Sequence, residues 1–125
     1  MIVLDANVLI AHLDQHDVHH TTAKKRLLEL ADQPFGASSI TLAEVLVAPT
    51  RAGSLPAAQA ALRVLDIAEL ELPPNASERL AALRVDTSLK LPDCCVLLAA
   101  ETSPGSVLTF DERLAREATR RGLSV

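Results

Sequence analysis

Met1-Ile-Val-Leu-Asp-Ala-Asn-Val-Leu-Ile10 is the stretch of sequence that decides the fold of this chain. Its first part, Ile2–Leu4, is a short apolar run without alternation, which is typical of a strand buried on both faces of a parallel sheet. The run ends at Asp5, and residues 6–13 look helical. A buried strand, an acidic residue and a helix in direct succession predict one unit of a doubly wound α/β fold.

The rest of the chain repeats this alternation of strand and helix. Further strands are predicted at 35–40, 67–72, 106–110 and 123–125, of which 67–72 alternates as a strand near an edge does. Between them, helices are predicted at about 23–33, 41–49, 56–66, 76–86, 93–100 and 111–121. The chain is therefore expected to form a single domain, 1–125, with the fold of a three-layer α/β/α sandwich around a parallel sheet of four or five strands. The first and fourth predicted strands are expected to be neighbours at the switch point of the sheet.

Composition limits the kinds of binding surface that the chain can form. Among 125 residues, 49% are apolar and 2% aromatic, so that Phe35 and Phe110 are the only phenyl rings able to stack on a base. The net charge of -4 argues against a strongly basic nucleic-acid clamp, although the charge of one face can differ from that of the whole molecule.

The cysteines and the apolar runs indicate in which cellular compartment the protein is expected. Cys94 and Cys95 are adjacent, which strains a disulfide, and they are interpreted as reduced thiols of a cytoplasmic protein. No signal peptide and no uninterrupted apolar stretch of membrane-spanning length is recognised, so no membrane association is expected.

Four carboxylates occupy comparable places in the predicted fold. Each is expected where a strand or loop gives way to a helix: Asp5, Glu44, Asp93 and Asp111. Such junctions gather along one edge of a parallel sheet, so the four side chains are predicted to line one acidic pocket. Clustered acids repel one another, and Mg²⁺ or Mn²⁺, with water completing the coordination, would neutralise them.

Each acid also has a structural interpretation that involves no catalysis. Aspartate is a favoured N-cap residue, and Thr41-Leu-Ala-Glu44 has the pattern of a capping box, an interaction worth about 1 kcal/mol. Asp93 fits this interpretation least, because Pro92 already supplies the preferred first residue of an otherwise apolar helix.

The four acids stand in short motifs, which are Leu4-Asp5-Ala-Asn7-Val-Leu-Ile10, Glu44 in a helix, Leu91-Pro-Asp93, and Leu108-Thr109-Phe-Asp111 with Leu114. These motifs resemble those of PIN-domain ribonucleases. The resemblance covers essentially the whole chain, whose length is most similar to that of the VapC-type toxins of bacterial toxin–antitoxin pairs.

This resemblance implies a metal-dependent endoribonuclease that cuts RNA with an activated water. It implies Asp5 and Asp93 as the principal ligands of Mg²⁺ or Mn²⁺, with Glu44 and Asp111 completing the site. Asn7 stands where the family often has Ser or Thr, and Thr109 matches the hydroxyl two residues before the last acid. The family also implies a cognate antitoxin, and exposed apolar surface on helices 56–66 and 76–86 suggests a homodimer.

Other polar residues have weaker claims to function. Arg113 and Arg116 are the best candidates for contacts with the RNA backbone, because they lie within about two turns of Asp111, and Arg51 is a weaker one. The histidine-rich segment 12–20 is interpreted as a solvated loop rather than a metal site, because its polar run should end the preceding helix.

Two other classes of function remain open from the sequence. A magnesium-dependent phosphatase of the dehalogenase type needs a second Asp two residues after the first, where this chain has Asn7, and a phosphoacceptor protein needs a late lysine, for which only Lys90 is available. A non-catalytic PIN-like module that only binds a partner would share the same acids.

Overall fold

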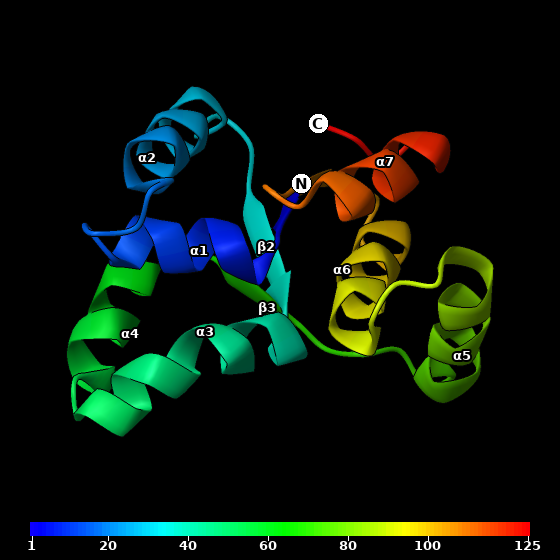
Figure 1. Ribbon diagram of the computed structural model, residues 1–125, viewed down its shortest axis with the longest axis horizontal. Helices are drawn as coiled ribbons and strands as arrows, with labels where there is room; N and C mark the ends of the chain where they lie inside the picture. The colour runs from blue at the N-terminus through cyan, green and yellow to red at the C-terminus, as the bar shows by residue number, and fades with distance from the viewer.

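Four strands form a parallel sheet at the centre of the molecule. A computed structural model describes residues 1–125 and orders the strands β3-β2-β1-β4 (Figure 1). Their bounds are β1 Ile2–Leu4, β2 Phe35–Ser38, β3 Ala68–Leu70 and β4 Ser106–Leu108, and every pairing is parallel. The first and fourth strands are neighbours, and β3 lies at an edge, as the sequence predicted.

Helices cover both faces of this sheet, which confirms the three-layer α/β/α sandwich. One face carries the first four helices and the other carries the last three (Figure 1). The helices are α1 Ala6–Leu13, α2 His20–Glu29, α3 Ser39–Ala52, α4 Leu55–Val64, α5 Ala76–Thr87, α6 Leu91–Thr102 and α7 Glu112–Arg120. None of them is both long and apolar enough to cross a membrane.

The two faces of β1 explain why its sequence does not alternate. Ile2 and Leu4 belong to one core cluster, with residues of α1, α2 and α3, whereas Val3 belongs to the other, with residues of α5, α6 and α7. All three side chains are at most 1% exposed. A central strand of a three-layer fold is apolar at every position because each side chain enters one of two cores.

The prediction for the segment around Glu44 was wrong in two respects. The strand ends at Ser38 rather than residue 40, because Ser38 caps α3 by accepting a hydrogen bond from the backbone N–H of Ile40 at 3.2 Å. Thr41 is therefore inside the helix and fully buried, its hydroxyl has no partner in the protein, and no capping box forms. Glu44 lies in the second turn of α3, not at its start.

The end of the chain forms less sheet than expected. The predicted fifth strand, 123–125, is reduced to one bridge between Ser124 and Val107. Gly122 ends α7 with φ 72°, and the next backbone N–H, that of Leu123, donates to Ala118 O at 2.8 Å. This left-handed turn returns the chain to β4, as the glycine predicted.

A candidate acidic active site

Asp5 is held at the carboxyl end of β1 by two hydrogen bonds. Its Oδ1 accepts from the backbone N–H of Ala6 at 2.7 Å, and its Oδ2 accepts from the hydroxyl of Thr109 at 2.6 Å. The side chain is 7% exposed, and burial raises its pKa; both hydrogen bonds lower that pKa, and the charge of Asp111 raises it. Asp5 is thus fixed in orientation while its negative charge remains only partly compensated.

Thr109 connects Asp5 to Asp111 and to Asn7. Its hydroxyl oxygen accepts from the backbone N–H of Asp111 at 3.0 Å and, in a long contact of 3.4 Å, from the amide of Asn7. The Asn7 side-chain oxygen in turn accepts from the backbone N–H of Phe110 at 3.2 Å. Because β1 and β4 are adjacent, these five residues form one network, in which bonded residues lie 102 to 104 positions apart across the two strands.

Asp111 has a clear structural role beside any chemical one. It is the N-cap of α7, and its Oδ1 accepts from the backbone N–H of Leu114 at 2.9 Å. The other carboxylate oxygen has no partner in the protein and is available to a ligand.

Asp93 is the third residue of α6, a helix that packs on the same face of the sheet as α5 and α7. Its carboxylate accepts no hydrogen bond from the protein and is half-buried. Burial raises its pKa, and so do the charges of Asp5 and Asp111, while Lys90 and Arg113 lower it. A carboxylate without hydrogen-bond partners at this position does not cap α6, so its structural role is limited to a favourable negative charge in the first turn of the helix.

The turn before Asp93 is fixed by contacts that sequence reasoning missed. Arg84 donates through Nη1 to the carbonyl oxygens of Ser88, at 2.9 Å, and Leu89, at 2.7 Å. The Thr87 hydroxyl accepts from the backbone N–H of Leu89 at 3.1 Å. Hydrogen bonds from side chains to the backbone leave no periodic signal in a sequence, so only the structure could show how this turn positions Asp93.

Glu44 approaches the other acids from α3. Burial, followed by the charges of Asp5 and Asp93, raises its pKa, which places the three carboxylates within electrostatic reach of one another. The side chain is largely exposed, so solvent screens part of this repulsion. Glu44 also lines one end of a groove of about 480 Å³ between α1 and α3.

The donor set suits a hard divalent cation. None of the four acids forms a salt bridge with a basic side chain. Nor do three His, Cys, Asp or Glu side chains converge closely enough to hold an ion by themselves. Mg²⁺ commonly retains several waters and binds one or two protein carboxylates together with substrate phosphates, so the partly separated acids fit such an ion better than a closed protein cage would.

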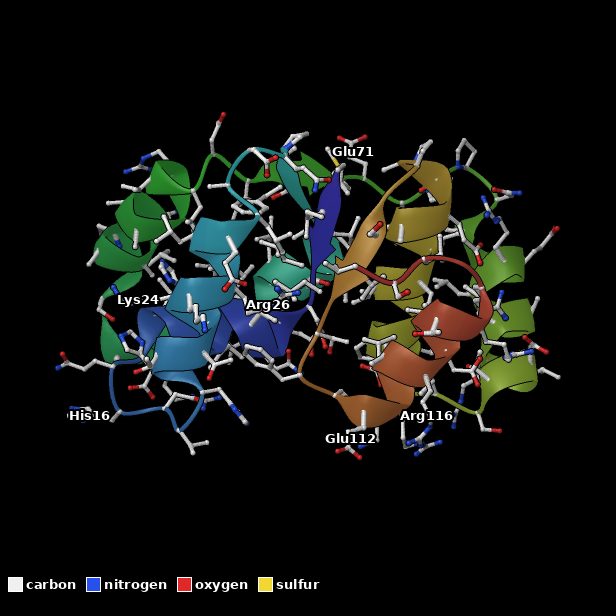
Figure 2. The ribbon with its side chains drawn as sticks, turned by 90° about the horizontal axis from the view of Figure 1, so that it is seen from above. His16, Lys24, Arg26, Glu71, Glu112 and Arg116 are labelled. Atoms are coloured by element: carbon white, nitrogen blue, oxygen red, sulfur yellow. The ribbon has the colours of Figure 1, made fainter.

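The remaining candidate residues are spread around this site. Arg113 is close enough to Asp93 to affect its pKa, whereas Arg116 projects to solvent from α7 (Figure 2). Arg51 is exposed in the last turn of α3, beyond Glu44. The structure thus brings one of the three arginines to the acids.

The histidines and cysteines agree with their structural interpretations. Helix α1 ends at Leu13, so His12 and His16 do not share a helix face. Cys94 and Cys95 are buried free thiols, and burial raises the pKa of each, which disfavours a reactive thiolate.

A cavity larger than the groove beside Glu44 does not contain the acids. It measures about 650 Å³ and lies between α2 and the segment after α4, lined among others by His12, Leu28 and Asp66. Cavity size and charge therefore indicate different places, and the raised pKa values of the carboxylates, which are typical of functional sites, favour the acidic site.

Fold and site together define the class, which is an α/β/α protein with carboxylates grouped near the switch point of a parallel sheet. A model of the PIN domain family matches residues 2–119, and the chain belongs to that family. A search of curated proteins finds no match.

Solved structures with the same fold cover most of the chain. A toxin–antitoxin complex from Klebsiella pneumoniae matches with 27% identity over 89% of this chain and 87% of that one, at a TM-score of 0.74. VapC20 of Mycobacterium tuberculosis, described as a toxin that cleaves the sarcin-ricin loop, is 18% identical. The match covers 94% of this chain and 95% of VapC20, at a TM-score of 0.75. The structure of VapBC2 of Rickettsia felis, bound to a DNA fragment from its promoter, contains a chain that is 18% identical. The match covers 93% of this chain and 92% of that chain, at a TM-score of 0.72.

Replacing Thr109 by valine should shift the pH dependence of metal binding. The Thr109 hydroxyl lowers the pKa of Asp5, so its loss should raise that pKa further, and half-maximal binding should move to higher pH. We also expect a loss of stability of about 1–3 kcal/mol, because a buried acceptor loses its donor. Calorimetric titration with Mn²⁺ across a pH series measures the shift. Thr109→Ser, which keeps the hydroxyl, is the control, and an unchanged midpoint in Thr109→Val would contradict the role assigned to Thr109.

Proposed function

We propose that this protein is a divalent-metal-dependent endoribonuclease and the toxin of a toxin–antitoxin pair. Membership of the PIN domain family and the similarity to toxin structures support this proposal. The observation that carries it is the grouping of Asp5, Glu44 and Asp93, whose pKa values are raised by burial first and by neighbouring acids second, and none of which forms a salt bridge. A protein that retains such repulsion at one edge of its sheet gains from a bound cation there.

Asp5 and Asp93 are the residues that would hold the cation most directly. Asp5 is oriented by Thr109 and Ala6, and Asp93 has both carboxylate oxygens free. Glu44 and Asp111 would complete the site, Asp111 through the oxygen that does not cap α7. Bound Mg²⁺ or Mn²⁺ supplies an activated water at neutral pH and stabilises negative charge on the phosphate.

The chain's own residues determine how the phosphodiester meets this water. Arg113, beside Asp93, is placed to contact a neighbouring phosphate, and the acids can accept the proton that the water loses. The water oxygen bonds to phosphorus as the bond from phosphorus to the 3′ oxygen breaks, and the 3′ oxygen takes up a proton. The products are a 5′ phosphate and a 3′ hydroxyl.

The phosphatase alternative is less well supported. A dehalogenase-type mechanism needs a proton donor two residues after the first Asp, and Asn7 occupies that position. The Asn7 side-chain nitrogen donates to the Thr109 hydroxyl, and its side-chain oxygen accepts from the backbone N–H of Phe110. Asn7 therefore supports the acidic site and does not serve as a proton donor. A non-catalytic module would keep the fold and the acids but cut no RNA, and the following experiment distinguishes it.

Cleavage of a panel of structured RNAs tests the proposed reaction. With Mg²⁺ or Mn²⁺ we expect fragments that carry 5′ phosphates, and none in excess chelator. An RNA with 2′-deoxyribose at the cut nucleotide should still be cleaved, because this route does not use the 2′-hydroxyl as nucleophile. Cyclic 2′,3′-phosphate products would show that the proposed chemistry is wrong, and intact RNA under all conditions would favour the non-catalytic module.

We propose that the antitoxin occupies the groove between α1 and α3. Apolar residues make up more than half of the lining of this groove, among them Ile10, Leu13 and Val45, and Glu44 also lines it. A segment with apolar side chains followed by a basic one would fill the groove and reach the acids, thereby blocking the site. The Klebsiella pneumoniae complex, whose toxin shares this fold, supports such a partner.

We further propose that the toxin forms a homodimer. Val64 at the end of α4 and Val85 on α5 are 85% and 84% exposed, and because these helices lie on opposite faces of the sheet (Figure 1), a two-fold interface would cover one of the two valines. Light scattering over a concentration series measures the state, and a monomer at every concentration would refute the homodimer.

A further inference from the structure

One pair of aromatic rings lies directly beside the acidic site. The imidazole of His19 and the phenyl ring of Phe110 have centroids 5.1 Å apart and planes inclined by 33°. This separation is typical of rings in attractive contact. His19 comes from the loop before α2 and Phe110 from the loop after β4, so the contact joins two segments distant in sequence.

Phe110 is fixed relative to the acids. Its ring is partly buried against the core cluster that contains α1. Its backbone N–H donates to Asn7 Oδ1 at 3.2 Å, and its two neighbours in the chain are Thr109, bonded to Asp5, and Asp111. A ligand stacked over this ring would therefore be held at a defined place beside the acidic pocket.

Apart from its contact with Phe110, the side chain of His19 has no partner in the protein. It is the N-cap residue of α2, yet its side chain forms no capping hydrogen bond. Neither ring nitrogen bonds to the protein, and the residue is exposed. Its neighbour His20 differs, because His20 Nδ1 contacts Ala11 O at 2.7 Å and the ring is partly buried.

A backbone hydrogen bond orders the segment that carries His19. The His19 N–H donates to Asp17 Oδ1 at 2.8 Å, which forms a tight turn before the helix. Next to the ring pair lies a hollow of about 270 Å³ whose lining includes Phe110, Thr109 and, from α2, Thr22 and Arg26. The histidine loop, marked by His16, and the start of α7, marked by Glu112, lie along the same side of the molecule (Figure 2). This hollow therefore offers a phenyl ring, hydroxyls and the guanidinium of Arg26, which also pairs with Glu29 at 3.0 Å, beside the loop that leads to Asp111.

We propose that His19, supported by Phe110, binds an unpaired nucleobase of the RNA next to the cleaved phosphate. This inference rests on the proposed ribonuclease function and assigns a specificity residue to it. Unpaired RNA bases stack on His and Phe rings, and the free imidazole nitrogens can bond to a base edge. The chain has no Tyr or Trp that could serve instead. Loss of one stacked base typically weakens binding about 5- to 150-fold.

The test pairs His19 variants with abasic RNA substrates. A stem-loop RNA that the wild-type protein cuts is synthesised with each nucleotide flanking the cut replaced, in turn, by an abasic one. In the wild-type protein one abasic position should raise KM roughly tenfold. His19→Ala should raise KM by a similar factor with the intact RNA, and the abasic replacement should then have no further effect. His19→Phe should restore most of the affinity, and His16→Ala, in the same loop without a ring contact, should change nothing.

The outcomes separate this inference from the proposed function. If the wild-type protein cuts no RNA, both fail. If it cuts RNA but His19→Ala keeps the wild-type KM, or if the effects of His19→Ala and of the abasic position simply multiply, only the nucleobase site is wrong. A fall in kcat alone, with unchanged KM and a lowered melting temperature, would likewise assign His19 to packing of Phe110.

Discussion

Asp5→Asn is expected to reduce RNA cleavage by more than about 100-fold, the upper size of the losses seen when residues that merely support a metal ligand are removed. Asp5 is the most buried of the four acids and receives two hydrogen bonds that orient it. Asparagine keeps the shape of the side chain but loses the charge that attracts the cation. The rate is measured as kcat/KM on an RNA that the wild-type protein cuts, with Mg²⁺ or Mn²⁺ saturating.

Glu112→Gln is the matched control for this substitution. Glu112 is an exposed acid one residue beyond Asp111, and removing its charge tests a general effect of charge on RNA binding. We expect wild-type cleavage by Glu112→Gln. Asp5→Asn should remain folded, because burial of its charge is unfavourable without a cation. Near-wild-type cleavage by a folded Asp5→Asn protein would remove Asp5 from the active site.

Asp93→Asn is expected to stabilise the metal-free protein and to abolish most of its stabilisation by metal. The pKa of Asp93 is raised in the folded state, so the folded protein binds its proton more tightly than the unfolded chain does. The free energy of unfolding of the wild type should therefore fall as pH rises from about 4 through the raised pKa, and it should remain lower at neutral pH. Asp93→Asn has no negative charge at this position, so its free energy of unfolding should not fall in this way as pH rises.

Thermal unfolding with and without Mn²⁺ measures both effects. At a metal concentration 100-fold above Kd, the wild type should gain about 2.7 kcal/mol, a rise in Tm on the order of 10 °C. Asp93→Asn should begin from a higher Tm and gain much less. The exposed Asp32→Asn, on a different part of the surface, should behave as the wild type does in both conditions. An equal gain for Asp93→Asn and the wild type would show that Asp93 does not bind the metal.

Strands and helices could be predicted wherever the local pattern and the tertiary environment agreed. Ile2–Leu4 was recognisable because a strand buried on both faces needs apolar residues throughout, and Gly122 because a left-handed turn favours glycine. The start of α3 could not be placed, since two competing caps, Ser38 and Thr41, lie three residues apart. Burial of Thr41 against the core decided between them.

The sequence by itself determined which residues carry charge at the ends of the strands, and hence that β1 and β4 would present Asp5 and Asp111 at one edge. Parallel strands with helices between them allow few arrangements, so this part followed from order along the chain. Only the tertiary structure decided how the acids are held. Thr109 bonds Asp5 from a position 104 residues away, and Arg84 fixes the turn before Asp93. It also decided that His19 stacks on Phe110. These contacts depend on distances between segments that no local pattern encodes, because each side chain could meet several partners until the packing of the sheet and helices selects one.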